Sequence, residues 1–308
     1  MIVCIDEGYL TTIGNARASQ LYCEALDKGH YFDGNATCME MMRASVNDHA
    51  STFQKEMMKT GRSMNLTGKL RQFLTRLNAS DFSFDDLLRI LSKPSRILVE
   101  NSMYEGPVYD HMMRTYYRDP SFGNLYAKLK IARDNGFLTY EHGGGCSHFK
   151  GLLEQAELDD YKGISKYKFC TIIDRDADGP EYKLIEQRNN LFKYLADKSN
   201  SNLEDNDIYT LDQQKYIWHM WYKREIENYF PDTHFKRIGV DPDNWPQLPE
   251  DRNYKKLSEG TGFKKDKLKN LTDGMSREKY EEGLKMFHCN GYKMSELQLF
   301  LLKLVKLI

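Results

Sequence analysis

Between residues 95 and 230, short apolar stretches alternate with longer segments that have helical spacing. The apolar stretches predict four strands, which are SRILVEN (95–101), FLTYE (137–141), YKFCTII (167–173) and DIYTL (207–211). Helices are predicted between them, over VYDHMMRTYY (108–117), FKGLLEQAEL (149–158) and YKLIEQRNNLFKYL (182–195). Strands that alternate with helices are typical of βαβ units. We therefore predict an α/β fold with a mainly parallel sheet flanked by helices.

The segments on either side of this region have different patterns. Residues 1–93 are predicted to be mostly helical after an opening strand at Ile2–Ile5, with one helix along LTGKLRQFLTRLN (66–78). Ser83, with an acid three residues later, is typical of a capping box that starts another helix. Residues 231–308 hold four of the eight prolines and are predicted to be loop-rich, then helical over 276–287 and in the last residues. The sequence thus predicts three regions, 1–93, 94–230 and 231–308.

Composition limits the functions that this chain could have. The formal net charge is −1, so no overall positive charge attracts nucleic acid, and any such ligand must be bound by local patches. The six cysteines form no CxxC pair, which is typical of reduced thiols in a cytosolic protein. The start of the chain does not resemble a signal peptide, and lysines interrupt the apolar segment LQLFLLKLVKLI (297–308). We therefore expect a cytoplasmic protein that does not span a membrane.

Acidic residues gather where the predicted strands end. In KFCTIIDRDADGP (168–180), Asp174, Asp176 and Asp178 directly follow an apolar strand, and Glu100 lies at the end of the first predicted strand. Carboxylates this close repel one another, so a metal ion, Arg and Lys side chains or bulk water must offset their charge. Parallel sheets bind ligands beyond the carboxyl ends of their strands. Carboxylates that converge there are suited to Mg²⁺ or Mn²⁺, and such ions are suited to phosphodiester chemistry.

Other kinds of protein also contain closely spaced aspartates. An EF-hand requires a glutamate at the twelfth position from Asp174, where Ile185 stands, and its loop follows a helix rather than a strand. The EF-hand interpretation therefore fails. A phosphatase with a nucleophilic DxD motif normally carries that motif on its first strand, whereas here the motif follows the third. An acidic turn that simply faces solvent stays open as an alternative.

Four features in this order resemble a TOPRIM domain over roughly residues 95–230. They are a strand that ends in Glu100, a glycine-rich turn at Gly143–Gly145, a strand that ends in the DxD pair of Asp174 and Asp176, and the segment KREIENYF (223–230). The pattern is most similar to TOPRIM nucleases of the OLD family and to their relatives in phage defence. One departure is Asn101, where the family usually has a glycine that lets the backbone approach a phosphate.

The resemblance implies a role for each of these residues. Glu100 corresponds to a glutamate that acts as a metal ligand or acid–base group, and Lys223 would be a cation near the transition state. The implied catalytic residues are Glu100, Asp174, Asp176 and Lys223. The implied metal ligands are Glu100, Asp174, Asp176, Glu225 and Glu227, with Asp178 as an additional acid. The candidate substrate contacts are Gly143, Gly144 and Gly145, whose amides are expected at a helix N-terminus, and His148 beside them. A plain strand-to-helix link is an alternative for the glycines, and an incidental surface histidine is the alternative for His148.

A nuclease of this family would use Mg²⁺ or Mn²⁺ to cleave phosphodiester bonds in DNA or RNA, including tRNA. The resemblance further implies an antiviral effector that acts with a partner ATPase or a retron complex, and a homo-oligomer is compatible with it. Any ATP dependence would come from a partner, because the sequence has no Walker A motif. Two alternatives stay open: a topoisomerase-like or primase-like TOPRIM enzyme, and a TOPRIM scaffold that binds nucleic acid or a partner without turnover.

Three further segments have both a structural and a functional interpretation. Trp218 and Trp221, beside basic residues, would pack in a core or stack on bases. The segment FKKDKLK (263–269) would be a solvated face or would follow a phosphate backbone. The C-terminal segment SELQLFLLKLVKLI (295–308) is apolar over more than one face. We hypothesise that it packs either in an interface or in the chain's own core.

Overall fold

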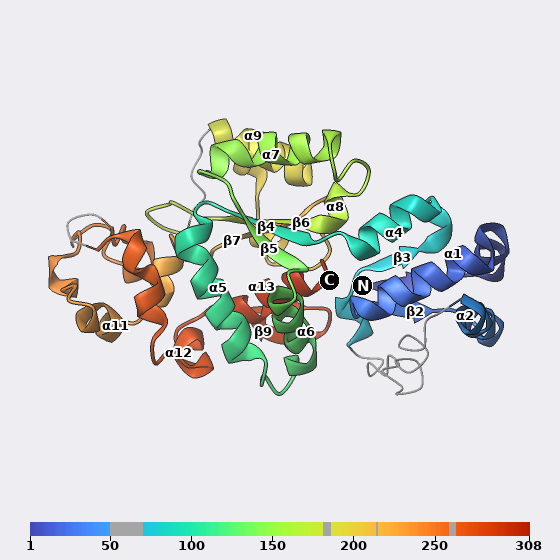
Figure 1. Cartoon of the computed structure of the whole chain (residues 1–308). Coiled ribbons are helices and arrows are strands. Elements are labelled where there is room, and N and C mark those ends of the chain that lie inside the picture. The colour runs from blue at the N-terminus through green and yellow to red at the C-terminus, as the bar shows by residue number, and fades with distance from the viewer. Residues whose placement is uncertain (50–69, 181–185, 214, 259–262) are drawn as a thin grey trace.

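A four-stranded parallel sheet forms the centre of the computed structural model, which describes residues 1–49, 70–180, 186–213, 215–258 and 263–308 (Figure 1). The strands are β4 (Ser95–Val99), β5 (Leu138–His142), β6 (Phe169–Ile173) and β7 (Ile217–Met220), in the order β5-β4-β6-β7. All neighbouring pairs are parallel, and every residue of β6 is buried. A strand buried on both faces consists of a continuous apolar run, as in FCTII. The predicted α/β fold with a mainly parallel sheet is confirmed at this level.

Helices cover both faces of this central sheet (Figure 1). One face carries α7 (Cys146–Leu158) and α9 (Glu186–Ala196), and the other carries α5 (Ser102–Tyr116), α6 (Gly123–Asp134) and α13 (Glu296–Val305). Helix α5 starts where β4 ends, because the Asn101 side chain accepts a hydrogen bond from the Met103 amide and so caps it. The short helices α8 (Ser165–Lys168) and α10 (Asp205–Ile208) precede β6 and β7. The central sheet is therefore the middle layer of three.

Residues 1–93 contain a second, smaller parallel sheet beside several helices. Its strands are β1 (Ile2–Cys4), β2 (Tyr31–Asp33) and β3 (Arg76–Asn78), in the order β2-β1-β3, and only β1 is predicted from the sequence. The helices are α1 (Glu7–Asp27), α2 (Ala36–His49) and α4 (Phe84–Ser92), and Ser83 caps α4 as predicted. The prediction of a helix over 66–78 is wrong for residues 70–78, which the structure describes. Arg71–Phe73 forms a 3-10 turn and β3 pairs with β1, while 66–69 lie outside the described residues.

The fourth strand of the central sheet is not where the sequence predicts it. The prediction places it over 207–211, but these residues include the end of α10 and a bend that follows it. Glu204 and Asp207 form a capping box, in which each side chain accepts a hydrogen bond from the other residue's amide, so a helical turn begins here. The strand is instead β7, and Trp218 within it is buried in the core, as is Trp221 just after it. Neither ring is free to stack on a base.

Residues 231–308 contain short elements separated by loops. They include α11 (Asp232–Arg237), α12 (Arg277–Glu281) and the antiparallel strands β8 (Met286–Cys289) and β9 (Tyr292–Ser295). Asn290 and Gly291 join these two strands, and both have the positive φ that a tight hairpin requires. The helix predicted over 276–287 is therefore cut short by β8. The 3-10 helices of the described residues are η1 (Arg71–Phe73), η2 (Ala79–Asp81), η3 (Asn200–Asn202), η4 (Ile226–Tyr229), η5 (Pro242–Asn244), η6 (Arg252–Tyr254) and η7 (Lys265–Thr272).

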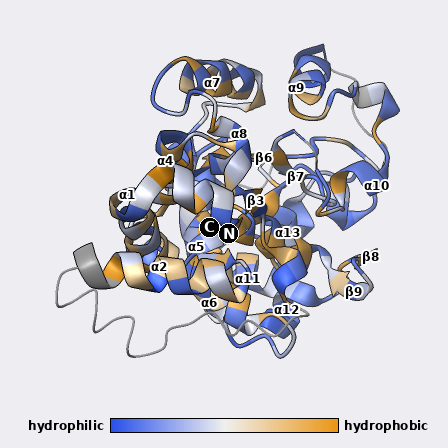
Figure 2. Cartoon of the chain, turned by 90° about the vertical axis from the view of Figure 1, so that its right-hand side faces the viewer, coloured by the Kyte–Doolittle hydropathy of each residue, from blue (hydrophilic) through white to orange (hydrophobic). Residues whose placement is uncertain are grey.

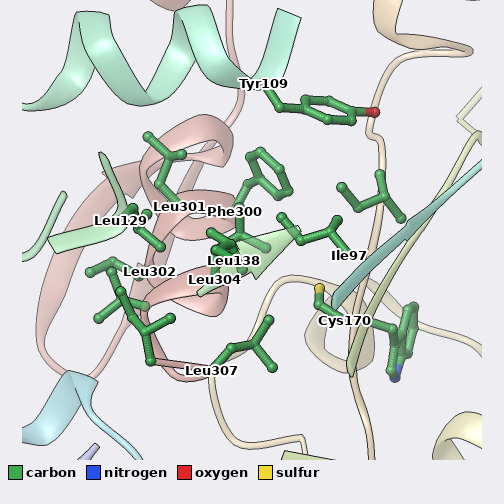
Figure 3. Packing of buried hydrophobic residues seen from close by; sticks show 14 of the residues in the cluster. Ile97, Tyr109, Leu129, Leu138, Cys170, Phe300, Leu301, Leu302, Leu304 and Leu307 are labelled. Atoms are coloured by element: carbon green, nitrogen blue, oxygen red, sulfur yellow. The ribbon is translucent and has the colours of Figure 1, made fainter. Parts of the chain in front are cut away.

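Helix α13 lies in the hydrophobic core beneath the central sheet. Its buried apolar side chains are Leu297, Leu299, Phe300, Leu301, Leu302, Leu304 and Val305. Figure 3 shows Phe300 and its neighbours packed with Ile97 of β4, Leu138 of β5 and Tyr109 of α5. The hypothesis that this segment packs in an interface is therefore wrong, and its alternative, closure of the chain's own core, is what the structure shows.

The first and last residues of the chain lie side by side (Figure 1, Figure 2). The Met1 ammonium donates a hydrogen bond to the Ile308 carbonyl oxygen, and both residues are buried. The small N-terminal sheet is thereby joined to the end of the segment that contains α13. Within the described ranges, no helix combines the length and the apolar character that a membrane span needs.

Candidate active site

The two strands that precede the predicted acids are neighbours in the central sheet. From β4 the chain crosses to β5 on one side, and it then returns to the other side of β4 as β6. Parallel sheets bind ligands outside the carboxyl ends of the two strands at such a reversal. Glu100 follows β4 and Asp174 follows β6, and the charge of Glu100 contributes to the raised pKa of Asp174. The prediction that these two strand ends are neighbours is confirmed.

Three carboxylates surround the ammonium group of Lys265 at this edge of the sheet. Lys265 Nζ lies 3.6 Å from Asp174 Oδ2, 3.5 Å from Glu225 Oε2 and 3.7 Å from Glu227 Oε1. All three acids are buried, and Glu227 is fully removed from solvent. Asp174 follows β6, the two glutamates belong to η4 and its N-cap, and Lys265 begins η7. We call Asp174, Glu225 and Glu227 the acid cluster.

The sequence did not indicate Lys265 as a site residue. It lies in FKKDKLK (263–269), a segment whose sequence predicts a solvated face or a contact with a phosphate backbone. In a 3-10 helix such as η7, residues three apart share one side. Lys265 therefore shares its side with the buried Leu268 and Leu271, whereas Lys264 and Lys267 lie on other sides. This spacing is the signal that could have separated Lys265 from the other lysines.

Lys223, the catalytic cation implied by the resemblance, contacts other groups than the acid cluster. Its Nζ donates a hydrogen bond to the Asn228 carbonyl oxygen at 3.2 Å and lies 4.9 Å from the centre of the Tyr229 ring. Burial lowers the pKa of Lys223 to about 8. Lys223 therefore stabilises η4 through its contacts with Asn228 and Tyr229. Among the described lysines, Lys265 is the one within ion-pair distance of the acid cluster.

Helix α13 holds the segment that carries two of the acids. Glu296, in the first turn of α13, accepts hydrogen bonds from the Tyr222 amide and from the Tyr229 hydroxyl, both at 2.6 Å. Glu296 is fully buried, so these bonds form in an interior of low dielectric, where they are strong. Tyr222 and Tyr229 lie on either side of Glu225 and Glu227 in the sequence. The core of the molecule therefore fixes the position of both glutamates.

Burial makes the carboxylates of this site difficult to ionise. It raises the pKa of Glu227 to about 8 and the pKa of Asp174 well above its usual value, although the Lys265 charge opposes both shifts. The pKa of Glu100 is raised for the same reason. Burial by itself lowers the pKa of Lys265, but the charges of Glu227, Asp174 and Glu225 outweigh it, so this pKa is raised. The acids therefore ionise only to the extent that a cation offsets their charge.

A further buried acid, Glu105, lies close enough to this site to feel its charges, and the sequence did not indicate it. Its carboxylate accepts hydrogen bonds from the Asn101 amide and the Tyr109 hydroxyl, both at 2.9 Å. Burial raises the pKa of Glu105 to about 7, against the opposing effects of the Asn101 hydrogen bond and the Lys265 charge. Glu105 lies in the first turn of α5. A search for acids in the first helical turn after β4 would have found it.

The other two aspartates of the implied metal set pair with arginines. Asp176 forms an ion pair with Arg188, whose side chain is buried, and Asp178 forms one with Arg224. The Asp178 side chain is 77% exposed. Arginine thus offsets these two charges, which is one of the explanations that the sequence left open. In the part of the chain that the structure describes, neither aspartate forms an ion pair with Lys265.

The glycine turn packs directly against the end of β4. The Gly143 amide donates a hydrogen bond to the Val99 carbonyl oxygen at 2.8 Å, and the next amide donates to the Glu100 carbonyl oxygen at 3.1 Å. Two of the three amides are therefore engaged inside the chain rather than free to bind a substrate. Gly145 is the N-cap of α7, and His148 is exposed in the first turn of that helix. The turn's clearest role is to bring the start of α7 beside Glu100.

The chemistry of the acid cluster suits a hard divalent cation. Glu225 Oε2 and both carboxylate oxygens of Glu227 are buried and have no hydrogen-bond partner among the described residues. Buried polar atoms are normally satisfied, and carboxylate oxygens are the ligands that Mg²⁺ and Mn²⁺ prefer. Within the same residues, no group of three or more His, Cys, Asp or Glu side chains is already spaced to hold a metal ion. The acids are instead arranged around the Lys265 ammonium.

Comparison of the chain with family models, with curated proteins and with solved structures gave no match. The four-stranded parallel sheet with helices on both faces is consistent with a Rossmann-like or TOPRIM-like fold. Any assignment of function therefore rests on the residues of the chain and on their arrangement at the edge of this sheet.

Proposed function

We propose that this chain is a metal-dependent nuclease of the TOPRIM type, which hydrolyses phosphodiester bonds in DNA or RNA with Mg²⁺ or Mn²⁺. The observation that carries the proposal is the acid cluster, whose buried oxygens include three without a hydrogen bond among the described residues, beside the ends of two neighbouring parallel strands. A cluster with a purely structural role would be expected to satisfy its carboxylates with hydrogen-bond donors. The Glu227 carboxylate has no such donor among the described residues, so its oxygens can serve a cation.

In this proposal the acid cluster holds the metal ion, and Glu100 lies beside it. A bound Mg²⁺ or Mn²⁺ supplies a more acidic water and offsets the negative charge of the phosphate. Glu105, whose pKa burial raises to about 7, can accept or return a proton near neutral pH. Glu296 keeps the two glutamates of the acid cluster in position through its bonds to the flanking tyrosines. The buried surroundings exclude water from these groups and so strengthen the electrostatic interactions between them and a bound cation.

Lysines on the outer sides of η7 support a nucleic acid as the substrate. Lys264 and Lys269 are exposed and Lys267 is half-buried, and none of them has an ion-pair partner among the described residues. Contacts with phosphates supply most of the affinity of non-specific nucleic-acid binding. Because η7 also carries Lys265, a phosphate backbone bound along η7 would lie beside the acid cluster. An antiviral role, with a partner ATPase, a retron complex or a second copy of the chain, is part of this proposal and rests on the sequence resemblance.

A second candidate function is a nucleic-acid-binding scaffold without turnover. The observation that favours it is the internal pairing of the acids, since Asp176 pairs with Arg188, Asp178 with Arg224, and the acid cluster with Lys265. A chain that offsets its own acids in this way needs no metal ion for its stability. It would bind nucleic acid equally well with and without a divalent cation.

Incubation of the purified protein with plasmid DNA, single-stranded DNA and total RNA, in Mg²⁺, Mn²⁺ or EDTA, separates these functions. We expect cleavage of at least one substrate with a divalent cation and none in EDTA. Asp174→Asn and Glu227→Gln should each lower the rate by about 100-fold or more, because each removes a charged group from the reacting centre. Glu40→Gln, which changes an exposed acid on α2, is the control and should leave the rate unchanged. Metal-independent binding without cleavage, or a full rate in both site variants, would favour the scaffold.

A further inference from the structure

Lys265 lies at the centre of the acid cluster, which the proposed function assigns to a metal ion. We propose that its ammonium group is a built-in counter-cation, which holds the three acids in the metal-free protein and must be displaced before a divalent cation binds. This inference rests on the proposed function. It adds a competition between two cations for the same carboxylate oxygens.

The distances at the acid cluster make this competition direct. Lys265 Nζ lies 3.5–3.7 Å from one oxygen of each of the three acids. A Mg²⁺ ion requires oxygen ligands at about 2.0–2.1 Å, so an ion bound to these oxygens would have the ammonium as a near neighbour of like charge. Charges of the same sign repel strongly at such separations in a buried site. The acid cluster therefore cannot hold both cations at full strength.

The Lys265 side chain has a route out of the acid cluster. It is 30% exposed, so part of it already faces water, and a lysine side chain can rotate about several bonds. The rest of η7 is anchored, because Leu268 and Leu271 on the same side of the helix are fully buried. Displacement of the ammonium therefore needs a side-chain rotation and no movement of η7.

The same ion pairs account for the stability of the acid cluster without metal. Among the described residues, Glu227 has no other ion-pair partner, and the other partner of Glu225 is Arg224 at 3.8 Å. Without Lys265, three buried carboxylates would repel one another or remain protonated. An interaction that stabilises only the metal-free state also weakens metal binding, because the bound state must give it up. Lys265 should thus raise the stability of the metal-free protein and lower its metal affinity.

The substitution Lys265→Met tests this competition, since methionine retains much of the side-chain length and removes the charge. Lys236→Met is the control, because Lys236 is exposed on α11 and has no ion-pair partner among the described residues. Calorimetric titration of the full chain with Mn²⁺ should show binding about tenfold or more tighter for K265M and unchanged for K236M. Without metal, K265M should melt at a lower temperature than the parent, and Mn²⁺ should raise its Tm by more.

A second measurement uses the parent protein and stays informative if K265M does not fold. Acetylation of amines, followed by mass spectrometry, reports the accessibility of each lysine. Saturating Mn²⁺ should increase the labelling of Lys265 severalfold, because the displaced ammonium enters solvent, and should leave the exposed Lys269 unchanged.

The possible outcomes separate this inference from the proposed function. Mn²⁺ affinity in K265M equal to or below that of the parent overturns the competition. The competition is also overturned if the protein binds Mn²⁺ but the extent of Lys265 acetylation is the same with and without it. In both cases the nuclease proposal stands. A parent protein that neither binds Mn²⁺ nor cleaves any substrate removes the proposed function, and the competition with it.

Discussion

The acids gathered near the end of β6 differ in the ion pairs and hydrogen bonds that offset the cost of their burial. Asp176 has an arginine partner, Asp174 shares Lys265 with two glutamates, and Glu105 has two hydrogen-bond donors. Glu227 has an ion pair at 3.7 Å, no hydrogen-bond donor among the described residues, and the like charge of Glu225 beside it. An ionised carboxylate in an apolar interior is costly unless it is paired and hydrogen-bonded. Glu227 is therefore the acid that would gain most from a bound cation.

Glu105 should make the stability of the metal-free protein depend on pH. Its folded-state pKa of about 7 lies above the ordinary value of 4.5, so the folded protein retains a proton that the unfolded chain has lost. This contribution to stability is complete below about pH 4.5 and is lost as the pH rises through 7. Glu105→Gln keeps the neutral form at every pH. Thermal melting in EDTA should therefore fall less between pH 5 and 8 in this variant than in the parent.

The expected size of this effect is roughly 3 kcal/mol at most, since one pKa unit corresponds to about 1.4 kcal/mol. Glu40→Gln, at an exposed position on α2, is the control and should follow the parent. Equal slopes of Tm against pH in E105Q and the parent would show that Glu105 ionises normally in the folded protein.

The turn between β5 and α7 depends on the absence of one side chain. A Cβ atom at Gly143 would lie 2.0 Å from Phe149 Cε1 and 3.0 Å from the Val99 carbonyl oxygen. The first of these distances is far shorter than any packing contact, so Phe149 or the turn would have to move. Only glycine lets the end of β4, the turn and α7 meet at this point. The position of α7 beside Glu100 follows from that close approach.

Gly143→Ala should therefore lower the free energy of unfolding by about 1–3 kcal/mol, the usual cost of overpacking. Gly151→Ala is the matched control on α7, because a Cβ there meets nothing within 4 Å. It should instead raise the free energy of unfolding by about 0.5–1 kcal/mol, since alanine favours a helix more than glycine does. Urea denaturation of both variants provides the comparison. Similar effects of the two substitutions would mean that Phe149 moves aside at no cost.

The strands that carry the site were predictable because their signals are local. The boundaries predicted for β4, β5 and β6 lie within two residues of those observed. Each strand is a short apolar run between polar turns, and such a run needs no information from distant residues. The positions of Glu100 and Asp174 at one edge followed from the rule for parallel sheets. The hairpin at Asn290–Gly291 also has a local signal, because an Asn-Gly pair is typical of a tight two-residue hairpin loop.

The rest of the site depends on contacts between distant residues. The sequence DIYTL (207–211) has the composition of a strand, but the capping box at Glu204 favours a helical turn there. β7 contains His219, whose burial depends on α13. The Nε2 atom of His219 lies 3.3 Å from Oε1 of Glu296 in that helix. Lys265 reaches the acid cluster only because η7 packs against α5. No periodicity in the sequence shows which of several neighbouring lysines will meet those acids.

The whole molecule is assembled around α13. This helix packs against β7, α6 and β9, and through Glu296 it also holds η4. Lys303, a lysine within the apolar run of α13, is fully buried and donates a hydrogen bond to the Trp218 carbonyl oxygen at 2.7 Å. Apolar and charged side chains of α13 are thus both engaged within the chain. The stability of the acid cluster and that of the core therefore depend on the same helix.

Deletion of residues 296–308 should consequently abolish folding rather than assembly. The deletion removes the buried apolar side chains of α13 and leaves β7 and α6 without their shared partner. Circular-dichroism melting of the truncated chain should show no cooperative transition. The single substitution Leu301→Ala should lower the free energy of unfolding by about 2–5 kcal/mol, because it leaves a cavity in the core. Lys293→Ala, at an exposed position on β9, is the control and should change it by less than about 0.5 kcal/mol. A truncated chain that melts like the intact protein would mean that α13 covers a core that forms without it.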